Sequence, residues 1–274
     1  MKDVAVCVLT LNEELNISAC LKSVGLQYDE VHVVDSGSAD ATREIASIFT
    51  NHIYVRKQSG VYSAADQRNW ALKNIESDKK WILFVDADEL LDDDFSSCLS
   101  GVDELSGIDV VCVPLVYRLH GRIVKSQGYP NCHDRVVRRD VVFNSAVGEH
   151  VNSDKKIYLE GAKILHNFNS LGVARFWEKQ ARYASYIGGE LYLYRKNGVS
   201  RYYDKQDGNG GLKRFAAKIF WLRPLARFGY NYFYKKGFME GRAGLVLALN
   251  NAFFEYLVIV ASIEAARVDK GLEL

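Results

Sequence analysis

The stretch that decides the fold is Trp81-Ile82-Leu83-Phe84-Val85-Asp86-Ala87-Asp88-Glu89. Its apolar half predicts a buried strand over residues 81–85. Because residues i and i+2 of a strand point to the same side, Asp86 and Asp88 are expected to converge at the carboxyl end of this strand. Two adjacent carboxylates repel unless a cation lies between them, and oxygen ligands suit Mg²⁺ or Mn²⁺. The pattern therefore predicts a divalent-metal site, with a solvated acidic turn as the alternative.

Outward from this stretch, short apolar runs alternate with helical patterns, which is typical of βαβ units and a parallel sheet covered on both faces. Further strands are expected at 4–9, 31–34 and 52–55, and helices at 13–24, 41–49 and 64–75. From residue 108 the pattern changes to short strands at 109–117, 121–126, 135–137 and 141–143, then to helices at 171–195, 212–234 and 240–268. The prediction is an α/β domain over 1–170 and a helical region over 171–274.

Two earlier strands also end in polar residues. The first runs into Thr10-Leu11-Asn12-Glu13, and the second ends at Asp35. In open α/β sheets, ligands bind outside the carboxyl ends of the strands. A buried carboxylate at Asp35 is suited to accept a hydrogen bond from a nucleobase N–H group. Asp40 has a plainer interpretation, as a helix-capping residue.

Composition excludes some classes of protein. The chain has 274 residues and a net charge of +1, which argues against a generally basic nucleic-acid binder. Five cysteines show no paired spacing, as expected for reduced thiols in a cytoplasmic protein. A Gly-rich dinucleotide-binding fingerprint does not follow the first strand.

Taken together, these motifs resemble the inverting family 2 glycosyltransferases. The resemblance is carried by Val33-Val-Asp35-Ser-Gly-Ser-Ala-Asp40-Ala-Thr42, with Asp86-Ala-Asp88 about fifty residues later. The segments 65–72 and 233–244 are similar to bacterial lipopolysaccharide-core β-glucosyltransferase-like members. The resemblance implies a GT-A fold (a Rossmann-like mixed sheet) with a C-terminal helical extension, a nucleotide-diphosphate sugar donor, and a divalent metal.

Residue roles follow from the same resemblance. Asp35 would contact the base, Asp86 the ribose or the metal, and Asp88 would be the main metal ligand. Arg68 would face the diphosphate, where a guanidinium suits phosphate oxygens; the alternative is a surface arginine on a helix. The rest of the nucleotide pocket would be lined by Thr10, Asn12 and Glu13.

Inversion requires one base that takes the proton of the acceptor hydroxyl. Relatives often carry a Val-His-Glu stretch, and the matching residues here are Val147-Gly148-Glu149. Glu149 is therefore the predicted base, with Asp134 as the second candidate. Relatives also carry a histidine near His166, which becomes a candidate third metal ligand; a structural role is its alternative.

The tail has a different character. Residues 195–236 hold eleven Lys/Arg, two Asp and ten aromatics, the composition of a membrane interface. Polar residues interrupt the apolar segment 243–266, so a transmembrane span is not expected. We expect an anionic membrane surface as a partner, no nucleic acid, and a peripheral location on the cytoplasmic face of the inner membrane.

The sequence thus predicts a metal-dependent glycosyltransferase that moves a sugar to a glycan or lipid-linked acceptor in lipopolysaccharide-core or other cell-envelope synthesis. A nucleotidyltransferase is one rival, although it usually has a basic, Gly-rich phosphate loop after the first strand. A non-catalytic membrane-surface binding module is the other rival, and it would need no pair of aspartates.

Overall fold

The computed structural model describes residues 3–57, 63–101, 107–119, 121–126, 131–143, 150–151, 153–168, 170–200 and 218–273. The chain divides into two compact units. The first, called the α/β unit, comprises Met1–Ile123 and Tyr129–Ser170; the second, called the helical unit, comprises Val124–Gly128 and Leu171–Leu274. The main division falls at residue 170, and the short segment 124–128 belongs with the helical unit.

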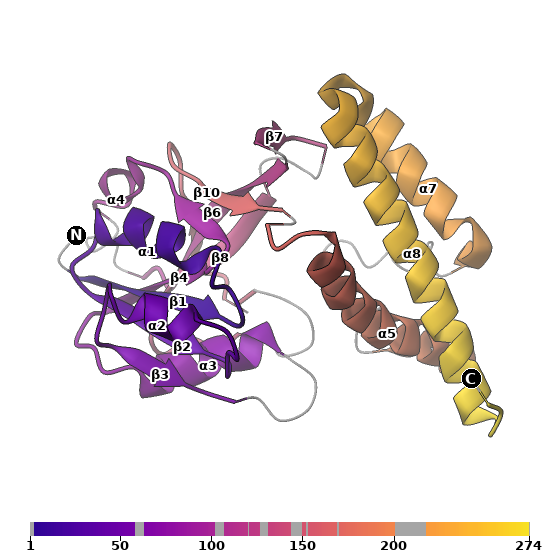
Figure 1. Ribbon diagram of the computed structural model, residues 1–274, viewed down its shortest axis with the longest axis horizontal. Coiled ribbons are helices and arrows are strands. Elements are labelled where there is room, and N and C mark those ends of the chain that lie inside the picture. Colours follow the sequence, from indigo (N-terminus) through magenta and orange to yellow (C-terminus); the bar gives the residue numbers. More distant parts are fainter. Residues whose placement is uncertain are drawn as a thin grey trace. The chain divides into compact units, whose positions relative to one another are not determined.

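The α/β unit is built on one mixed sheet with strand order β3-β2-β1-β4-β8-β6-β10-β5, while β7 and β9 both pair with β6 (Figure 1). Its strands are β1 (Val4–Thr10), β2 (Val31–Asp35), β3 (Ile53–Val55), β4 (Trp81–Asp86), β5 (Glu89–Leu91), β6 (Val110–Leu119), β7 (Arg122–Val124), β8 (Asn131–Arg138), β9 (Lys156–Tyr158) and β10 (Ile164–Asn167). Its helices are α1 (Ile17–Gly25), α2 (Thr42–Ala46), α3 (Ala64–Asn74) and α4 (Phe95–Cys98). The predicted α/β class is confirmed.

Both faces of the central strands are buried, which explains their uninterrupted apolar sequences. On β1, Val4, Val6 and Val8 pack in a core with α1, whereas Ala5, Cys7 and Leu9 pack in a second core with α3. Strand β4 alternates in the same way, so Ile82 and Phe84 face the α3 side. The next residue in this alternation is Asp86, which is therefore aimed toward α3.

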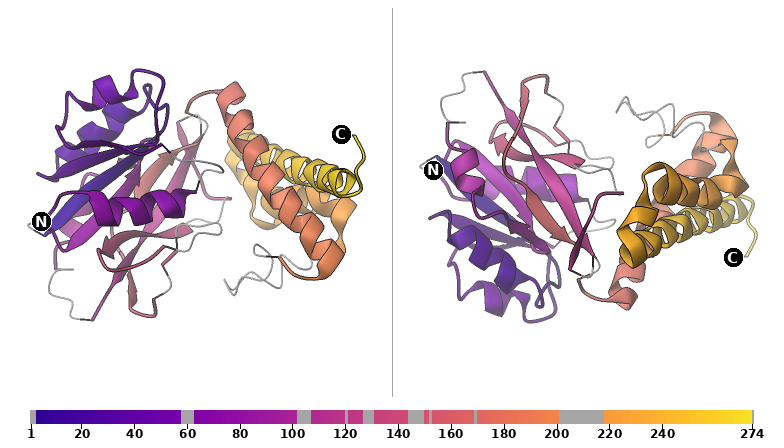
Figure 2. Two further views of the ribbon diagram at one scale, coloured as in Figure 1. Left: turned by 90° about the horizontal axis from the view of Figure 1, so that it is seen from below. Right: turned by 90° about the horizontal axis from the view of Figure 1, so that it is seen from above.

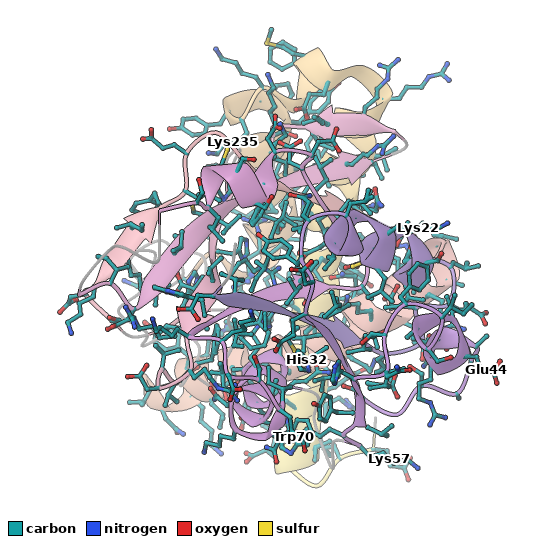
Figure 3. All side chains as sticks on the ribbon, turned by 90° about the vertical axis from the view of Figure 1, so that its left-hand side faces the viewer. Lys22, His32, Glu44, Lys57, Trp70 and Lys235 are labelled. Carbon is teal, nitrogen blue, oxygen red and sulfur yellow. The ribbon has the colours of Figure 1, made fainter. Side chains whose placement is uncertain are left out.

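Rings also cross from the sheet to α3. His32 on β2 and Trp70 on α3, both labelled in Figure 3, are linked through Tyr54 of β3. The ring centroids of His32 and Tyr54 are 5.9 Å apart, and those of Tyr54 and Trp70 are 6.4 Å apart. Burial lowers the pKa of His32, although Glu30 beside it opposes that shift.

Several predicted elements differ in extent. Helix α1 begins at Ile17 rather than 13, and α2 ends at Ala46 rather than 49. The N-cap position of α2 is Ala41, whose side chain makes no capping hydrogen bond. The expected strand at 141–143 is reduced to one bridge between Phe143 and Val151. Elements β5, β9, β10 and α4, each three or four residues long, were not predicted.

In the helical unit, α5 (Val173–Asn197) and α8 (Gly241–Asp269) pack side by side, and α7 (Arg223–Gly229) lies along α8 (Figures 1 and 2). The predicted single helix over 212–234 is wrong for its described part. It consists of η2 (Phe220–Leu222), α7 and η3 (Tyr230–Tyr234), followed by η4 (Gly237–Glu240). Pro224 opens α7, as proline does in a first helical turn, and Lys236 turns the chain with a φ of 59°. The loop expected at 207–211 lies outside the described residues.

Packing between α5 and α8 depends on a glycine. A Cβ atom built on Gly188 would lie 2.5 Å from the Cβ of Ala261 and 2.8 Å from the Ser262 nitrogen. Only glycine allows this close approach of the two backbones. By length and composition alone, the helical stretch Gly237–Asp269 could cross a membrane, with a mean hydropathy of 1.7 in its most apolar window.

Candidate active site

Three parallel strands end together at the edge where the sequence predicts a site. Strand β1 pairs with β2 and with β4, and the registers place Thr10 opposite Asp35 and Leu9 opposite Asp86. Polar side chains far apart in sequence therefore meet at one carboxyl edge, the usual ligand-binding position of such sheets. The predicted convergence of strand ends is found.

Asp86 is held by two arginines. Arg68 Nη2 donates to Asp86 Oδ1 at 3.0 Å, and Arg135 Nη2 donates to Asp86 Oδ2 at 3.2 Å. Both arginine side chains are buried, whereas the Asp86 side chain is 30% exposed. The cation that the paired carboxylates require is thus supplied in part by the chain itself.

The two arginines are placed by their elements. Arg68 lies on the buried face of α3 with Ala65, Ala71 and Leu72, at helical spacing, and its guanidinium carbon is 5.9 Å from the ring centroids of Phe84 and Phe143. The interpretation of Arg68 as a surface arginine is therefore wrong. Arg135 comes from β8, which pairs antiparallel with β4. A buried arginine needs a carboxylate partner, and Asp86 serves both.

Glu89 completes this ion-pair network. It is fully buried, accepts a hydrogen bond from Arg135 Nη2 at 2.6 Å, and accepts the Asp86 backbone N–H at 2.8 Å. Burial raises the pKa of the Glu89 carboxyl above its usual range, while the Arg135 guanidinium opposes that rise. Glu89 thus fixes both the backbone at Asp86 and the position of Arg135.

Asp88 does not continue the strand. Strand β4 ends at Asp86, Ala87 and Asp88 form a turn, and β5 starts at Glu89, so the predicted i, i+2 strand geometry is wrong. The turn sends the two aspartates to different neighbours. Asp88 Oδ1 lies 3.4 Å from His166 Nδ1 on β10, where His166 is the cross-strand partner of Glu89. We call Arg68, Asp86, Asp88, Glu89, Arg135 and His166 the sheet-edge cluster.

The sheet-edge cluster offers two groups to a divalent ion. Asp88 and His166 face each other with side chains 15% and 20% exposed, so an ion can reach them. Asp86 is engaged with arginines, which weighs against its predicted role as a metal ligand. Among the described residues, no three His, Cys, Asp or Glu side chains form a metal-binding group. Mg²⁺ is commonly bound by one or two carboxylates and completes its shell with phosphate and water, so Asp88 fits such an ion, whereas the imidazole of His166 is a ligand better suited to a transition metal.

Two of the predicted nucleotide-pocket residues, Asn12 and Glu13, are held by neighbouring residues that were not predicted to line the pocket. Asn12 has a φ of 56°; its N–H donates to Ser38 Oγ at 2.8 Å and its Oδ1 accepts the Ala39 N–H at 2.8 Å. The Glu13 N–H donates to Thr42 Oγ1, and Glu13 Oε2 accepts from Asn16. These bonds fix the loop after β1 against the turn after β2.

Asp35 is fully buried beneath that turn. Its Oδ2 accepts the N–H groups of Gly37 and Ser38 at 3.0 and 2.9 Å, and its Oδ1 accepts the Ser38 hydroxyl. The carboxylate therefore shapes the turn; contact with a nucleobase stays a prediction. Asp40 accepts the N–H and hydroxyl of Thr42 close to the start of α2. Burial acts to raise the pKa of Asp40, but these hydrogen bonds outweigh it and lower that pKa.

Asp134 is poorly suited to be a general base. It is buried, accepts the Val151 N–H at 2.7 Å, and pairs with Lys156 Nζ at 2.5 Å. Burial acts to raise the pKa of Asp134, but hydrogen bonds from His150, Lys156 and Val151 outweigh it and hold the pKa below its usual value. A buried carboxylate with a lowered pKa is a weak proton acceptor, and the contacts with Val151, Lys156 and His150 all fall on its Oδ2. The first candidate, Glu149, lies outside the described residues.

Sequence reasoning missed Arg135 and Glu89 as members of the site. Glu89 directly follows the aspartates, but β5 is too short to be recognised. Arg135 precedes the apolar residues Val136 and Val137, so a charged residue entering a buried strand was the available signal. The pairing of β8 with β4 was the missing information.

A comparison with protein families gives a match over half of the chain. The family model described as Glycosyl transferase family 2 matches residues 5–143. The SPbeta prophage-derived glycosyltransferase SunS of Bacillus subtilis is 23% identical over 210 residues, which cover 69% of this chain and 49% of that protein. The chain thus spans about half the length of this curated relative.

Solved structures are also similar. The S. aureus TarS 1–349 complex with UDP-GlcNAc is 18% identical, covers 98% of this chain and 92% of that chain, and has a TM-score of 0.48. The glucosyl-3-phosphoglycerate synthase of Mycobacterium tuberculosis in complex with Mg²⁺ and UDP is 20% identical, covers 50% and 56% of the two chains, and has a TM-score of 0.38.

Proposed function

The chain belongs to glycosyl transferase family 2, and on this premise we propose that it transfers a sugar, with inversion, from a nucleoside-diphosphate donor to a glycan or lipid-linked acceptor. The observation that carries the proposal is the sheet-edge cluster. It places carboxylates, a histidine and two arginines at the carboxyl edge shared by β1 and β4.

The donor would bind across the ends of β1, β2 and β4. Thr10 Oγ1 is buried there and, among the described residues, has no hydrogen-bond partner, so it is available to a ligand. The loop at Asn12 and Glu13 and the turn at Asp35 would line the nucleoside, as the resemblance implies. Because these segments are already hydrogen-bonded to one another, little ordering would be needed on binding.

Asp88 and His166 would hold a Mg²⁺ or Mn²⁺ ion against the diphosphate. Such an ion supplies Lewis-acid stabilisation of the leaving nucleoside diphosphate. Asp86 would instead receive the ribose or orient the arginines. Arg68 and Arg135 are buried and paired with Asp86 and Glu89, so they would act on the donor by positioning those carboxylates.

The acceptor hydroxyl would be deprotonated by Glu149. A general base contributes about 10²–10⁴-fold to a rate. Glu149→Gln should therefore keep donor and metal affinity but lose transfer by a factor in that range, in single-turnover assays with radiolabelled donor. Asp134→Asn is the comparison variant. If it loses transfer while Glu149→Gln keeps it, the assignment of the base is reversed.

A donor panel tests the function itself. Purified protein is incubated with UDP-, GDP-, ADP- and CMP-sugars, with Mn²⁺, Mg²⁺ or EDTA, and released products are identified by mass. We expect metal-dependent release of nucleoside diphosphate with at least one UDP-sugar. Release of pyrophosphate from a sugar phosphate and a nucleoside triphosphate would indicate a nucleotidyltransferase. Absence of both turnover and nucleotide binding would favour a non-catalytic membrane-surface module.

The acceptor proposal is an envelope glycan or glycolipid, made on the cytoplasmic face of the inner membrane. It is supported by the resemblance of segments 65–72 and 233–244 to lipopolysaccharide-core transferases. Transfer to extracted core oligosaccharide or glycolipid, followed by linkage analysis, tests it.

A further inference from the structure

Helix α8 exposes a row of apolar side chains, whereas an ordinary surface helix exposes polar ones. Large side chains on this line are 37–53% exposed. They are Leu245, Leu249, Phe253, Tyr256 and Ile263, called the apolar stripe. At about 100° per residue they fall within roughly 80° of one another, and they extend over about 27 Å of helix.

The charged side chain within this part of α8 does not lie on the apolar stripe. Between residues 245 and 263 the only charged residue is Glu255. Glu255 pairs with Arg223 on α7, with Oε2 2.9 Å from Nε and 2.5 Å from Nη2. At helical spacing, the exposed residues Arg242 and Arg267 lie on the same line as the stripe, one beyond each end. The stripe itself is uncharged, with Arg242 beyond one end and both Arg267 and the exposed Glu264 beyond the other.

The neighbouring face of the same unit is ordinary. On α5, Arg175, Lys179, Arg182 and Ser185 are exposed, as expected for a helix that faces water. Exposed apolar residues also occur on α5, at Val173, Tyr183 and Leu193, but they are ten residues apart and form no continuous line. A stripe of this size is a site of interaction rather than a scattered surface residue.

The segment that packs along α8 adds interfacial residues. Trp221, Leu225, Phe233, Tyr234 and Phe238 are each more than half exposed. Residues 218–242 hold six Lys/Arg and one Glu. That acid, Glu240, accepts hydrogen bonds from the N–H groups of Lys125 and Ser126 and from the Ser126 hydroxyl. Lys235, labelled in Figure 3, has its Nζ 5.6 Å from the Tyr230 ring centroid. Exposed aromatics beside basic residues are typical of a membrane–water interface.

We infer that the apolar stripe of α8 is a docking surface for an anionic lipid bilayer, with α8 lying in the plane of the interface. Crossing is disfavoured, because it would carry the Glu255–Arg223 pair into hydrocarbon. An in-plane helix instead buries the stripe among acyl chains, while Arg242 and Arg267 reach headgroups at its two ends. This inference goes beyond the proposed sugar transfer and does not depend on it.

Vesicle sedimentation with the full chain tests the inference. Vesicles are phosphatidylcholine alone or phosphatidylcholine with one quarter phosphatidylglycerol. The variant Leu249→Glu/Phe253→Glu places two charges on the stripe, and the control Ala181→Glu/Ser185→Glu places two charges at the same spacing on the exposed face of α5. We expect the wild type and the control to bind anionic vesicles, and the stripe variant to bind about 100-fold more weakly, from the lost burial of two large side chains.

The depth to which the stripe enters the bilayer is measured separately, in a variant that keeps the stripe apolar. Phe253→Trp should gain fluorescence that brominated lipids quench, beyond the quenching seen in the wild type. This readout holds even if the glutamate variant folds poorly. No added quenching, or equal vesicle binding by the stripe variant and the wild type, would overturn the inference.

Sedimentation velocity without lipid shows whether something other than a bilayer covers the apolar stripe. If the wild type dimerises and the stripe variant is monomeric, a second copy of the chain covers the stripe and the bilayer assignment is wrong. If the wild type neither binds vesicles nor dimerises, and the stripe variant melts at a lower temperature, the stripe packs within the chain itself, which also overturns the inference.

Discussion

The two units of this chain differ in which side chains they bury: the α/β unit buries charged residues at one edge, and the helical unit exposes an apolar stripe. The α/β unit buries Arg68, Arg135 and Glu89, each at most 1% exposed, at one sheet edge, while apolar side chains such as Leu15, Leu26 and Ile48 are exposed on its surface. The helical unit leaves Trp221 70% exposed and an apolar stripe on α8, and turns Glu255 inward. A buried charge and an exposed apolar surface are both departures from ordinary burial, and each marks a position where a partner binds.

The largest effect is expected from a substitution at Asp88, in the sheet-edge cluster of the α/β unit. Asp88→Asn removes the carboxylate that faces His166, and sugar transfer should fall by more than about 10²-fold, since even outer-shell changes at metal sites cost 10–100-fold. Asp93→Asn makes the same charge change at an exposed position. Equal activity of the two variants, with EDTA having no effect, would show that no metal acts here.

Arg135 separates a positioning role from a merely structural one. Arg135→Ala leaves Glu89 buried without its arginine partner and frees one oxygen of Asp86, so turnover should fall about 10–100-fold and stability should decrease. Arg135→Lys should recover stability better than turnover, because lysine lacks the guanidinium fork. Arg138→Ala, on the same strand but outside the sheet-edge cluster, should lower stability alone. If Arg138→Ala loses as much turnover as Arg135→Ala, Arg135 has no positioning role beyond its contribution to stability.

Gly188 tests whether the helical unit can be disturbed by itself. A Cβ at this position would meet Ala261 at 2.5 Å, so Gly188→Ala should cost about 1–3 kcal/mol through overpacking. Gly189→Ala meets nothing within 4 Å and should be neutral or stabilise by about 0.5–1 kcal/mol. Thermal unfolding measures both, and nucleotide binding to the α/β unit should not change. If the two alanine variants melt together, the close packing of α5 on α8 is incorrect.

The last effect, on stability at Asp134, is of similar size at pH 7 and vanishes at low pH. The pKa of this carboxyl is held below its usual value in the folded chain, so its contribution to stability is present above about pH 4, the pKa of an unfolded aspartate, and is lost as pH falls through the folded pKa. Asp134→Asn should therefore destabilise by about 1–3 kcal/mol at pH 7. In urea unfolding, the gap between wild type and variant should narrow near pH 3. A gap that is constant with pH would show that ion pairing at Asp134 contributes nothing.

Much of the first unit follows from sequence because its information is local. The apolar runs at β1, β2 and β4 are long enough to identify buried strands, and parallel pairing then brings Thr10, Asp35 and Asp86 to one edge. The details at Asp88 did not follow, because a two-residue turn redirects it toward His166. The partners of Asp86 required the pairing of β8 with β4, which no local pattern specifies.

In the helical unit, composition predicted a membrane-interface surface, and that stays a prediction. The basic and aromatic stretch 195–236 was expected to carry it, although residues 201–217 lie outside the described part. The exposed stripe of α8 could not be separated from a core stripe, because periodicity shows that apolar residues share a face and not whether that face is covered.

One measurement directly tests whether Asp88 binds the metal while Asp86 binds the arginines. Mn²⁺ binding in the presence of UDP is followed by electron paramagnetic resonance for the wild type, Asp86→Asn and Asp88→Asn. Because Asp86 pairs with Arg68 and Arg135 while Asp88 faces His166, we predict at least a tenfold loss of Mn²⁺ affinity in Asp88→Asn and only a few-fold change in Asp86→Asn. Equal losses in the two variants, or unchanged affinity in Asp88→Asn, would contradict this account.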